Sequence, residues 1–140
     1  MNSILSLNIR GFGGHPKFVA LRDLFISSKS NIILIQESMH FVAKTIDYFR
    51  RMLPTWSIVA TNATGRSGGL VVFWDPRWAK LKAFSCSMGI FLVGYIRGIP
   101  GRLHILNVYA PYKEREGLWD TMEVSGILNA PSLIFAGDLN

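Results

Sequence analysis

The segment Ile32-Ile33-Leu34-Ile35-Gln36-Glu37 decides the fold class of this chain. Four consecutive aliphatic residues are typical of a β-strand that is covered on both faces, because a strand with one exposed face alternates apolar and polar residues. The carboxylate that follows such a strand needs a hydrogen bond, an ion pair or a metal, since an unpaired buried charge is costly. We therefore expect a layered fold with Glu37 at the end of an interior strand.

The residues before this segment predict a strand and a helix. Residues 4–9 suit a short strand, and Pro16 is well placed in the first turn of the helix that follows. The apolar positions of that helix recur at helical spacing and are Phe18, Leu21, Leu24 and Phe25. A strand, a helix and a second strand in this order predict a parallel pair of strands.

The rest of the chain adds antiparallel strands and two more helices. A helix is expected at residues 41–52, with Phe41, Ile46 and Phe49 as its apolar positions. A second helix is expected at 113–128, and strands at 56–60, 70–74, 81–84, 90–96, 103–109 and 133–136, with 90–96 and 103–109 forming a hairpin. This order predicts an α/β (α+β) layered sandwich of mixed β-sheets flanked by helices, in one domain spanning residues 1–140. Because the chain stops just after an apolar strand, we expect the domain to be incomplete at its C-terminus.

Composition restricts the class of protein. Fifteen Lys and Arg residues against nine Asp and Glu give a net charge of +6, which favours a polyanionic partner such as nucleic acid but also simply aids solubility. The single cysteine, Cys86, excludes an internal disulfide and fits a reducing compartment. The sequence has no secretory signal and no apolar run of about 20 residues. We expect a protein of the nucleus or cytoplasm that is neither secreted nor bound to a membrane.

Polar residues follow several of the predicted strands at their carboxyl ends. Where strands run parallel, these ends meet at one edge of the sheet, so Asn8, Glu37 and Asp138 are expected there. Two carboxylates suit Mg²⁺, with Mn²⁺ as a substitute, while Asn8, Asn140 and Tyr109 carry groups that can bind phosphate oxygens. Each residue also fits an ordinary role, in a helix cap, a turn, an ion pair or the core.

Five short motifs contain these polar residues or lie between them. They are Leu7-Asn8-Ile9-Arg10-Gly11, Ile35-Gln36-Glu37-Ser38, Ser67-Gly68-Gly69-Leu70, Asn107-Val108-Tyr109-Ala110-Pro111 and Gly137-Asp138-Leu139-Asn140. In this order they resemble successive motifs of the endonuclease/exonuclease/phosphatase superfamily. Their wording looks most like the endonuclease domain of plant LINE-type (non-LTR) retrotransposons.

The resemblance implies a magnesium-dependent DNA endonuclease that hydrolyses a phosphodiester by in-line attack of water. By this likeness Glu37 is the main metal ligand. Asp138 aligns or deprotonates the water and also contacts the metal, as does Asn140. Asn8 binds the scissile phosphate, and Tyr109 stabilises the oxyanion.

The chain also departs from the family pattern. Arg10 stands where DNA-repair relatives have aspartate, and the later Ser-Asp-His motif with its catalytic histidine is missing. His15, His40 and His104 all precede the Gly-Asp-Leu-Asn motif, so none of them replaces it. We therefore expect this fragment to be inactive or nearly so. The Ser67-Gly68-Gly69 motif is expected to form a turn where the backbone is closely approached.

Two other interpretations remain open at this point. The same motifs occur in phosphatases that act on phosphoinositides or nucleotides. The chain could instead be a non-catalytic relic that binds nucleic acid through basic residues. Candidates for contacts to the nucleic-acid backbone are Arg10, Lys17, Arg66, Lys113 and Arg115, each of which also fits a solvated surface.

Overall fold

The aliphatic segment at residues 32–36 lies at the centre of the molecule. The structure is a computed structural model that describes residues 3–64, 67–86, 89–109 and 115–138. Strand β2 (Ile32–Gln36) is buried along its whole length. Ile33 and Ile35 face one apolar core, and Ile32 and Leu34 face another. The prediction of a strand covered on both faces is confirmed, and the alternation follows from the two-residue period of a strand.

The first sheet has the strand order β1-β2-β6-β3. Strand β1 (Ile4–Asn8) pairs in parallel with β2, so that Asn8 lies opposite Gln36. Strands β6 (Leu70–Trp74) and β3 (Ser57–Ala60) complete the sheet in antiparallel orientation. The expected parallel pair is therefore present and forms one side of a mixed sheet.

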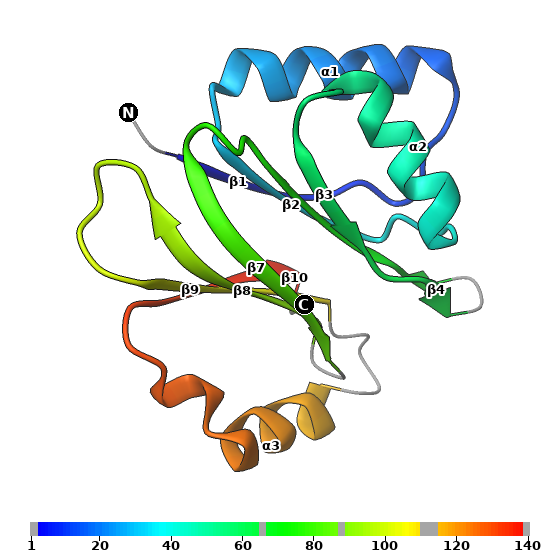
Figure 1. Ribbon diagram of the computed structural model, residues 1–140. Coiled ribbons are helices and arrows are strands. Elements are labelled where there is room, and N and C mark those ends of the chain that lie inside the picture. The colour runs from blue at the N-terminus through cyan, green and yellow to red at the C-terminus, as the bar shows by residue number, and fades with distance from the viewer. Residues whose placement is uncertain (1–2, 65–66, 87–88, 110–114, 139–140) are drawn as a thin grey trace.

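Helices α1 (His15–Ser28) and α2 (Val42–Met52) cover the outer face of this sheet, at the top of Figure 1. Pro16 lies in the first turn of α1, as predicted. Two predicted apolar positions were wrong: Leu24 is 40% exposed and Phe41 is 73% exposed. Phe41 precedes α2 as its N-cap residue, so it lies outside the helical face that buries Phe49.

The second sheet has the order β10-β9-β8-β7. Strands β7 (Ala79–Cys86), β8 (Gly89–Ile96) and β9 (Leu103–Tyr109) are antiparallel, and β10 (Leu133–Asp138) is parallel to β9. The predicted hairpin of β8 and β9 is confirmed. Strands β4 (Ala63–Thr64) and β5 (Ser67–Gly68) form a separate short ladder.

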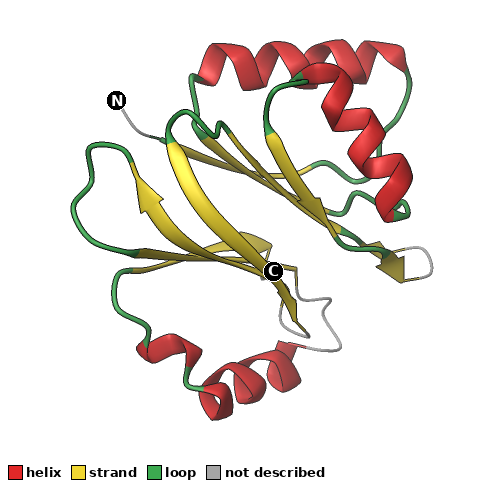
Figure 2. Cartoon of the chain, in the orientation of Figure 1, coloured by secondary structure: helices red, strands yellow, loops and turns green. Residues whose placement is uncertain are grey.

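Helix α3 (Arg115–Ser125) covers the outer face of the second sheet, at the bottom of Figures 1 and 2. The single helix predicted to residue 128 is interrupted: Gly126 has a φ of 75°, and a short 3₁₀ helix (Ile127–Asn129) follows it. A left-handed residue ends a helix because it turns the backbone out of the helical path. Met122 of α3 packs on Leu106 and Val108 of β9.

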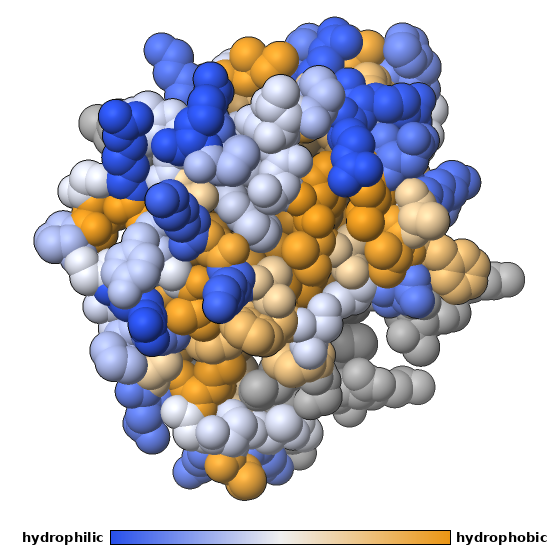
Figure 3. Space-filling model, in the orientation of Figure 1, coloured by the Kyte–Doolittle hydropathy of each residue, from blue (hydrophilic) through white to orange (hydrophobic). Residues whose placement is uncertain are grey.

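The four layers are therefore helices, sheet, sheet and helix, and the predicted fold class is confirmed. The core between the two sheets is aliphatic, with Leu70, Val72, Ile90, Leu92 and Ile105 among its members. Figure 3 shows hydrophilic residues gathered over α1 and α2 at the top of the view, with apolar residues below them. None of the helices in the described ranges combines the length and apolar character that a membrane-spanning helix requires.

The two parallel strand pairs face each other across the interface between the sheets. Strand β1 contacts β10, and β2 contacts both β9 and β10. All four strands run from left to right in Figure 1, so their carboxyl ends point in the same direction. The packing of the sheets thus brings to one edge the four strand ends that carry the first, second, fourth and fifth motifs.

Candidate active site at the ends of two parallel strand pairs

Four of the predicted site residues occupy strand ends at this edge. Asn8 is the last residue of β1, and Glu37 directly follows β2. Tyr109 and Asp138 are the last residues of β9 and β10 and lie opposite each other in the parallel ladder. The side chains of Tyr109 and Asp138, and the whole of Asn140, lie outside the described part of the structure.

A buried amide pair joins the two sheets next to these strand ends. The side-chain amide of Gln36 donates to Asn107 Oδ1 at 2.8 Å, and the amide of Asn107 donates to the carbonyls of Ile35 (3.2 Å) and Val71 (3.0 Å). Gln36 also donates to the hydroxyl of Ser6 at 3.1 Å. Gln36 is 2% exposed and Asn107 is fully buried, so these bonds form where water does not compete.

This amide pair sets the position of the predicted site residues. Gln36 directly precedes Glu37, while Asn107 lies two residues before Tyr109 and pairs with Ala136, two residues before Asp138. Two residues of a strand span about 7 Å. The Gln36–Asn107 bond therefore holds the start of the Glu37 loop within a short distance of the ends of β9 and β10.

Sequence reasoning gave neither Gln36 nor Asn107 a role. The available signal was a single amide residue inside each of two otherwise aliphatic strands, Ile-Ile-Leu-Ile-Gln and Leu-His-Ile-Leu-Asn-Val. A polar side chain in such a position must find partners in the interior. The sequence does not show that the two amides are partners of each other.

The loops that carry Asn8 and Glu37 are held to each other by backbone hydrogen bonds. Ile9 N–H donates to the Gln36 carbonyl at 3.1 Å, and Gly11 N–H donates to the Glu37 carbonyl at 2.7 Å. Arg10 and Glu37 have φ values of 52° and 56°, a region that is unfavourable for residues with a Cβ atom. Such strain is concentrated at functional sites, where surrounding contacts enforce it.

The Ser67-Gly68-Gly69 motif contacts the loop that follows Glu37. Ser38 N–H donates to the Gly69 carbonyl and Met39 N–H to the Gly68 carbonyl, both at 3.0 Å. A Cβ atom on Gly69 would lie 2.2 Å from Ser38 Oγ. The expected close approach of the backbone is thus confirmed at Gly69, and its partner is the segment immediately after Glu37. The expected turn is wrong for Ser67 and Gly68, which form strand β5.

The side chain of Glu37 has few contacts among the described residues. It is half-buried, and no hydrogen bond or ion pair joins its carboxylate to a described residue. A partly buried carboxylate without a protein partner fits a hard cation, and Mg²⁺ takes only one or two protein carboxylates beside water. Among the described residues no three His, Cys, Asp or Glu side chains form a denser metal cluster.

A groove of about 460 Å³ lies beside the Glu37 loop. It is lined by the loop after β1, the start of α1, the loop before α2 and α2 itself, and its lining includes His15, His40, Lys44 and Arg51. Burial, with a smaller contribution from Lys44, lowers the pKa of His40. The guanidinium of Arg51 lies over the ring of Phe18, 5.4 Å from its centre. The permanent cations Lys44 and Arg51 therefore line this groove.

The predicted nucleic-acid contacts have different outcomes. Arg10 is exposed in the loop after β1, whereas the amine of Lys17 donates to the Ile9 carbonyl and so stabilises that loop. Arg115 is the first residue of α3, and its side chain is not described. Arg66 and Lys113 lie outside the described residues.

Comparison with solved structures identifies proteins of the same fold. D. rerio TDP2, complexed with single strand DNA product, has a TM-score of 0.73 and 14% identity over 98% of this chain and 60% of its own. ANGEL2, a 2',3'-cyclic phosphatase, has a TM-score of 0.70 and 14% identity, and the match covers 98% of this chain and 52% of ANGEL2. The AP endonuclease LMAP from Leishmania major has a TM-score of 0.66 and 14% identity, and the match covers 97% of this chain and 54% of LMAP.

The chain spans little more than half the length of these solved structures. No protein-family model matches its sequence, and neither does any curated protein. All three solved structures belong to the endonuclease/exonuclease/phosphatase fold superfamily. The strand order and the two facing sheets therefore give this chain the fold of that superfamily.

Proposed function

We propose that this chain is part of a magnesium-dependent phosphodiester hydrolase that acts on DNA. The observation that carries the proposal is the buried Gln36–Asn107 bond, because it fixes the loop of Glu37 beside the ends of the two strands that end in Tyr109 and Asp138. Open α/β sheets bind ligands at the carboxyl ends of their strands, where Asn8, Glu37, Tyr109 and Asp138 lie.

In the proposed reaction, each residue acts on the phosphate or on the attacking water. Glu37 and Asp138 would hold Mg²⁺, assisted by Asn140, and Asp138 would also orient the water. Asn8 donates hydrogen bonds to the scissile phosphate, and the phenol of Tyr109 stabilises the oxyanion. Bound Mg²⁺ neutralises the charge that develops on the phosphate.

Two features favour nucleic acid as the substrate. The groove beside the Glu37 loop is lined by the cations Lys44 and Arg51, of which Arg51 also pairs with Asp47 at 3.6 Å, so that Lys44 offers a charge to a second phosphate. A structural neighbour is complexed with a single-stranded DNA product. A polyanion that reaches several cations gains affinity from released counterions, whereas a small phosphate ester contacts few of them.

We further propose a non-LTR retrotransposon as the origin of this chain. The support is the wording of the Asn-Ile-Arg-Gly and Asn-Val-Tyr-Ala-Pro-Tyr segments, which resembles LINE-type endonuclease domains. A Ser-Asp-His motif in frame after the Asn140 codon, followed by reverse-transcriptase sequence, is the expected finding. A reading frame that continues into an unrelated domain would contradict this origin.

The metal site is tested by cation binding, because this readout does not require activity. We expect Mn²⁺, measured by electron paramagnetic resonance, to bind the 140-residue chain and to be displaced by Mg²⁺. Glu37→Gln should abolish binding, since it removes the charge and leaves the shape of the side chain. Glu123→Gln, at an exposed position of α3, is the matched control. Equal binding by both variants would remove Glu37 from the site.

Activity is tested by nicking of supercoiled plasmid in the presence of Mg²⁺. We propose that the 140-residue chain is inactive or nearly so, because it contains no histidine that matches the one in the Ser-Asp-His motif. Cleavage that is lost in Glu37→Ala would contradict the inactivity and support the hydrolase. Salt-dependent DNA binding without any bound cation would instead favour a non-catalytic relic.

A phosphatase is the second candidate, because the neighbour ANGEL2 is a 2',3'-cyclic phosphatase with a TM-score of 0.70. The two functions are distinguished by assaying a longer protein that carries all the motifs. Phosphate release from a soluble phosphate ester without plasmid nicking would favour the phosphatase, and the opposite result the nuclease.

A further inference from the structure

The outer face of the second sheet is only partly covered by α3. Over β9 and β10, apolar side chains of the sheet pack against Met122 of the helix. Over β7 and β8 the same face is open and forms a groove of about 700 Å³. This groove lies on the side of the sheet that faces away from the core between the two sheets.

The strand register explains which side chains line the groove. On β7, Lys80, Lys82 and Phe84 alternate with Leu81 and Ala83, which pack on the core between the sheets. Lys80 lies opposite Tyr95 of β8, and Lys82 lies opposite Val93. Successive side chains of a strand point to opposite faces, so these residues share the outer face.

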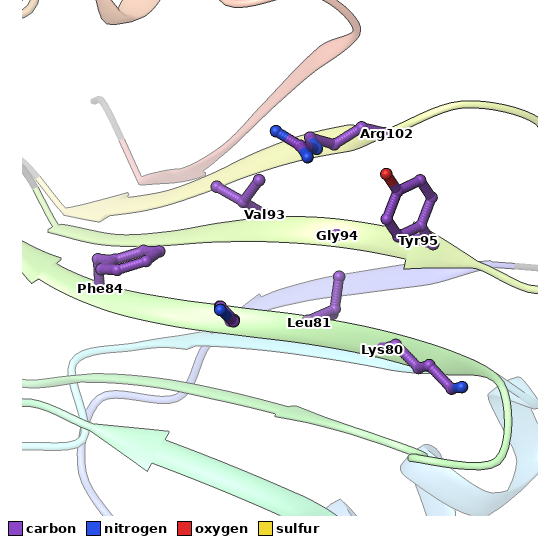
Figure 4. A pocket seen from close by; sticks show the side chains of 8 residues that line it. Lys80, Leu81, Phe84, Val93, Gly94, Tyr95 and Arg102 are labelled. Atoms are coloured by element: carbon purple, nitrogen blue, oxygen red, sulfur yellow. The ribbon is translucent and has the colours of Figure 1, made fainter.

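The groove combines positive charge with exposed aromatic rings. Its cations are Lys80, Lys82 and Arg102, none of its lining residues is acidic, and the ion pairs between described residues do not include these three. Phe84 and Tyr95 are each 52% exposed. In Figure 4, Tyr95 and Arg102 lie together toward one end of the groove and Phe84 lies toward the other.

We propose that this groove binds single-stranded nucleic acid, with its phosphates on the cations and its bases on the aromatic rings. Exposed rings beside cations suit unpaired bases, because a duplex hides the base faces on which the rings would stack. Phe84 and Tyr95 are offset by four residues along the strand direction, or about 13 Å, which is room for a few nucleotides. Because the groove is lined by three cations, it favours a polyanion as its ligand over an apolar protein surface.

The end of the groove that contains Lys80 and Tyr95 lies away from the strand ends that carry the proposed hydrolase. Lys80 and Tyr95 lie toward the other end of their strands, because β8 begins at Gly89, near Asn107, and runs away from it. The proposal therefore does not depend on the metal site. Strand binding here would hold an unpaired segment of a substrate away from the point of cleavage.

The test is fluorescence anisotropy with labelled ten-nucleotide oligothymidylate, oligouridylate and duplex DNA, all in EDTA. We expect both single strands to bind more tightly than the duplex. Three phosphate contacts predict a slope of about −2 for log K against log salt concentration, at about −0.7 per contact. Lys80→Gln with Lys82→Gln should reduce the magnitude of the slope to about 0.7.

The matched control is Lys29→Gln with Arg50→Gln, which removes the same charge from exposed positions on the helical side of the molecule. Phe84→Leu and Tyr95→Leu should each weaken binding by about fivefold or more with an unchanged salt slope, because the ring is lost but the cations remain. Circular dichroism of each variant verifies that it folds.

Four outcomes overturn the proposal. An equal loss of oligonucleotide affinity in the Lys29→Gln, Arg50→Gln control would show that the effect depends only on net charge. Tighter binding of duplex than of single strand would exclude base stacking, and concentration-dependent dimerisation without oligonucleotide binding would assign the groove to a second copy of the chain. Binding that is lost in Glu37→Gln but kept in Lys80→Gln with Lys82→Gln would place the strand at the hydrolase edge instead.

Discussion

Replacing the two members of the buried amide pair, singly and together, gives the sharpest test of how the site is held. In Asn107→Leu, three hydrogen bonds are lost: one from Gln36 and one each to the carbonyls of Ile35 and Val71. At about 1 kcal/mol of net stability each, the expected destabilisation is about 3 kcal/mol. Gln36 keeps its bond to Ser6, which limits the loss.

Substitution of the other member of the pair, Gln36, leaves a buried acceptor without a donor. Gln36→Met removes the donor to Asn107 Oδ1, and an unsatisfied buried polar atom costs about 1–3 kcal/mol. The double variant no longer contains the unpaired Asn107 Oδ1. The Gln36–Asn107 bond, which each single variant loses, contributes only once to the destabilisation of the double variant. We therefore expect the double variant to be about 1–2 kcal/mol more stable than the sum of the two single effects predicts.

The assay is equilibrium unfolding in urea, with free energies from linear extrapolation and two spectroscopic probes to verify two-state behaviour. Mn²⁺ binding by the same variants reports on the Glu37 loop, and each single variant should bind the ion more weakly. Effects that add to within about 0.5 kcal/mol would show that the two amides do not act as a pair. The Gln36–Asn107 bond would then no longer account for the position of the Glu37 loop beside the ends of β9 and β10.

Two further predictions concern neighbouring contacts. Gly69→Ala places a Cβ atom 2.2 Å from Ser38 Oγ and should weaken Mn²⁺ binding, whereas Gly101→Ala, with a similar positive φ but open space around it, should lose only stability. The hydrogen bond from Arg77 lowers the pKa of Asp75, so the stability from this pair is present above the ordinary value of 3.8 and is lost as the pH falls through the lower folded value. Arg77→Leu should therefore unfold more easily at pH 7 and show a smaller loss of stability below pH 3.8 than the parent; identical acid unfolding curves would contradict this.

Much of the fold could be predicted from the order of apolar segments. The run at residues 32–36 indicated an interior strand because only a strand covered on both faces tolerates continuous aliphatic residues. The predictions at Leu24 and Phe41 were wrong because a spacing pattern does not show where a helix begins or how far its partner surface extends. The interruption at Gly126 likewise depends on a local backbone conformation that periodicity does not report.

Motif order indicated which polar residues to examine, and their strand-end positions follow from the sequence alone. Only the tertiary structure showed that the pairs β1–β2 and β9–β10 pack against each other, with Gln36 and Asn107 bonded between them. The sequence determines each strand because apolar burial and strand period are local properties of the chain. The tertiary structure decides which strand ends meet, since residues 36 and 107 become neighbours only when the two sheets pack and exclude water from their amides.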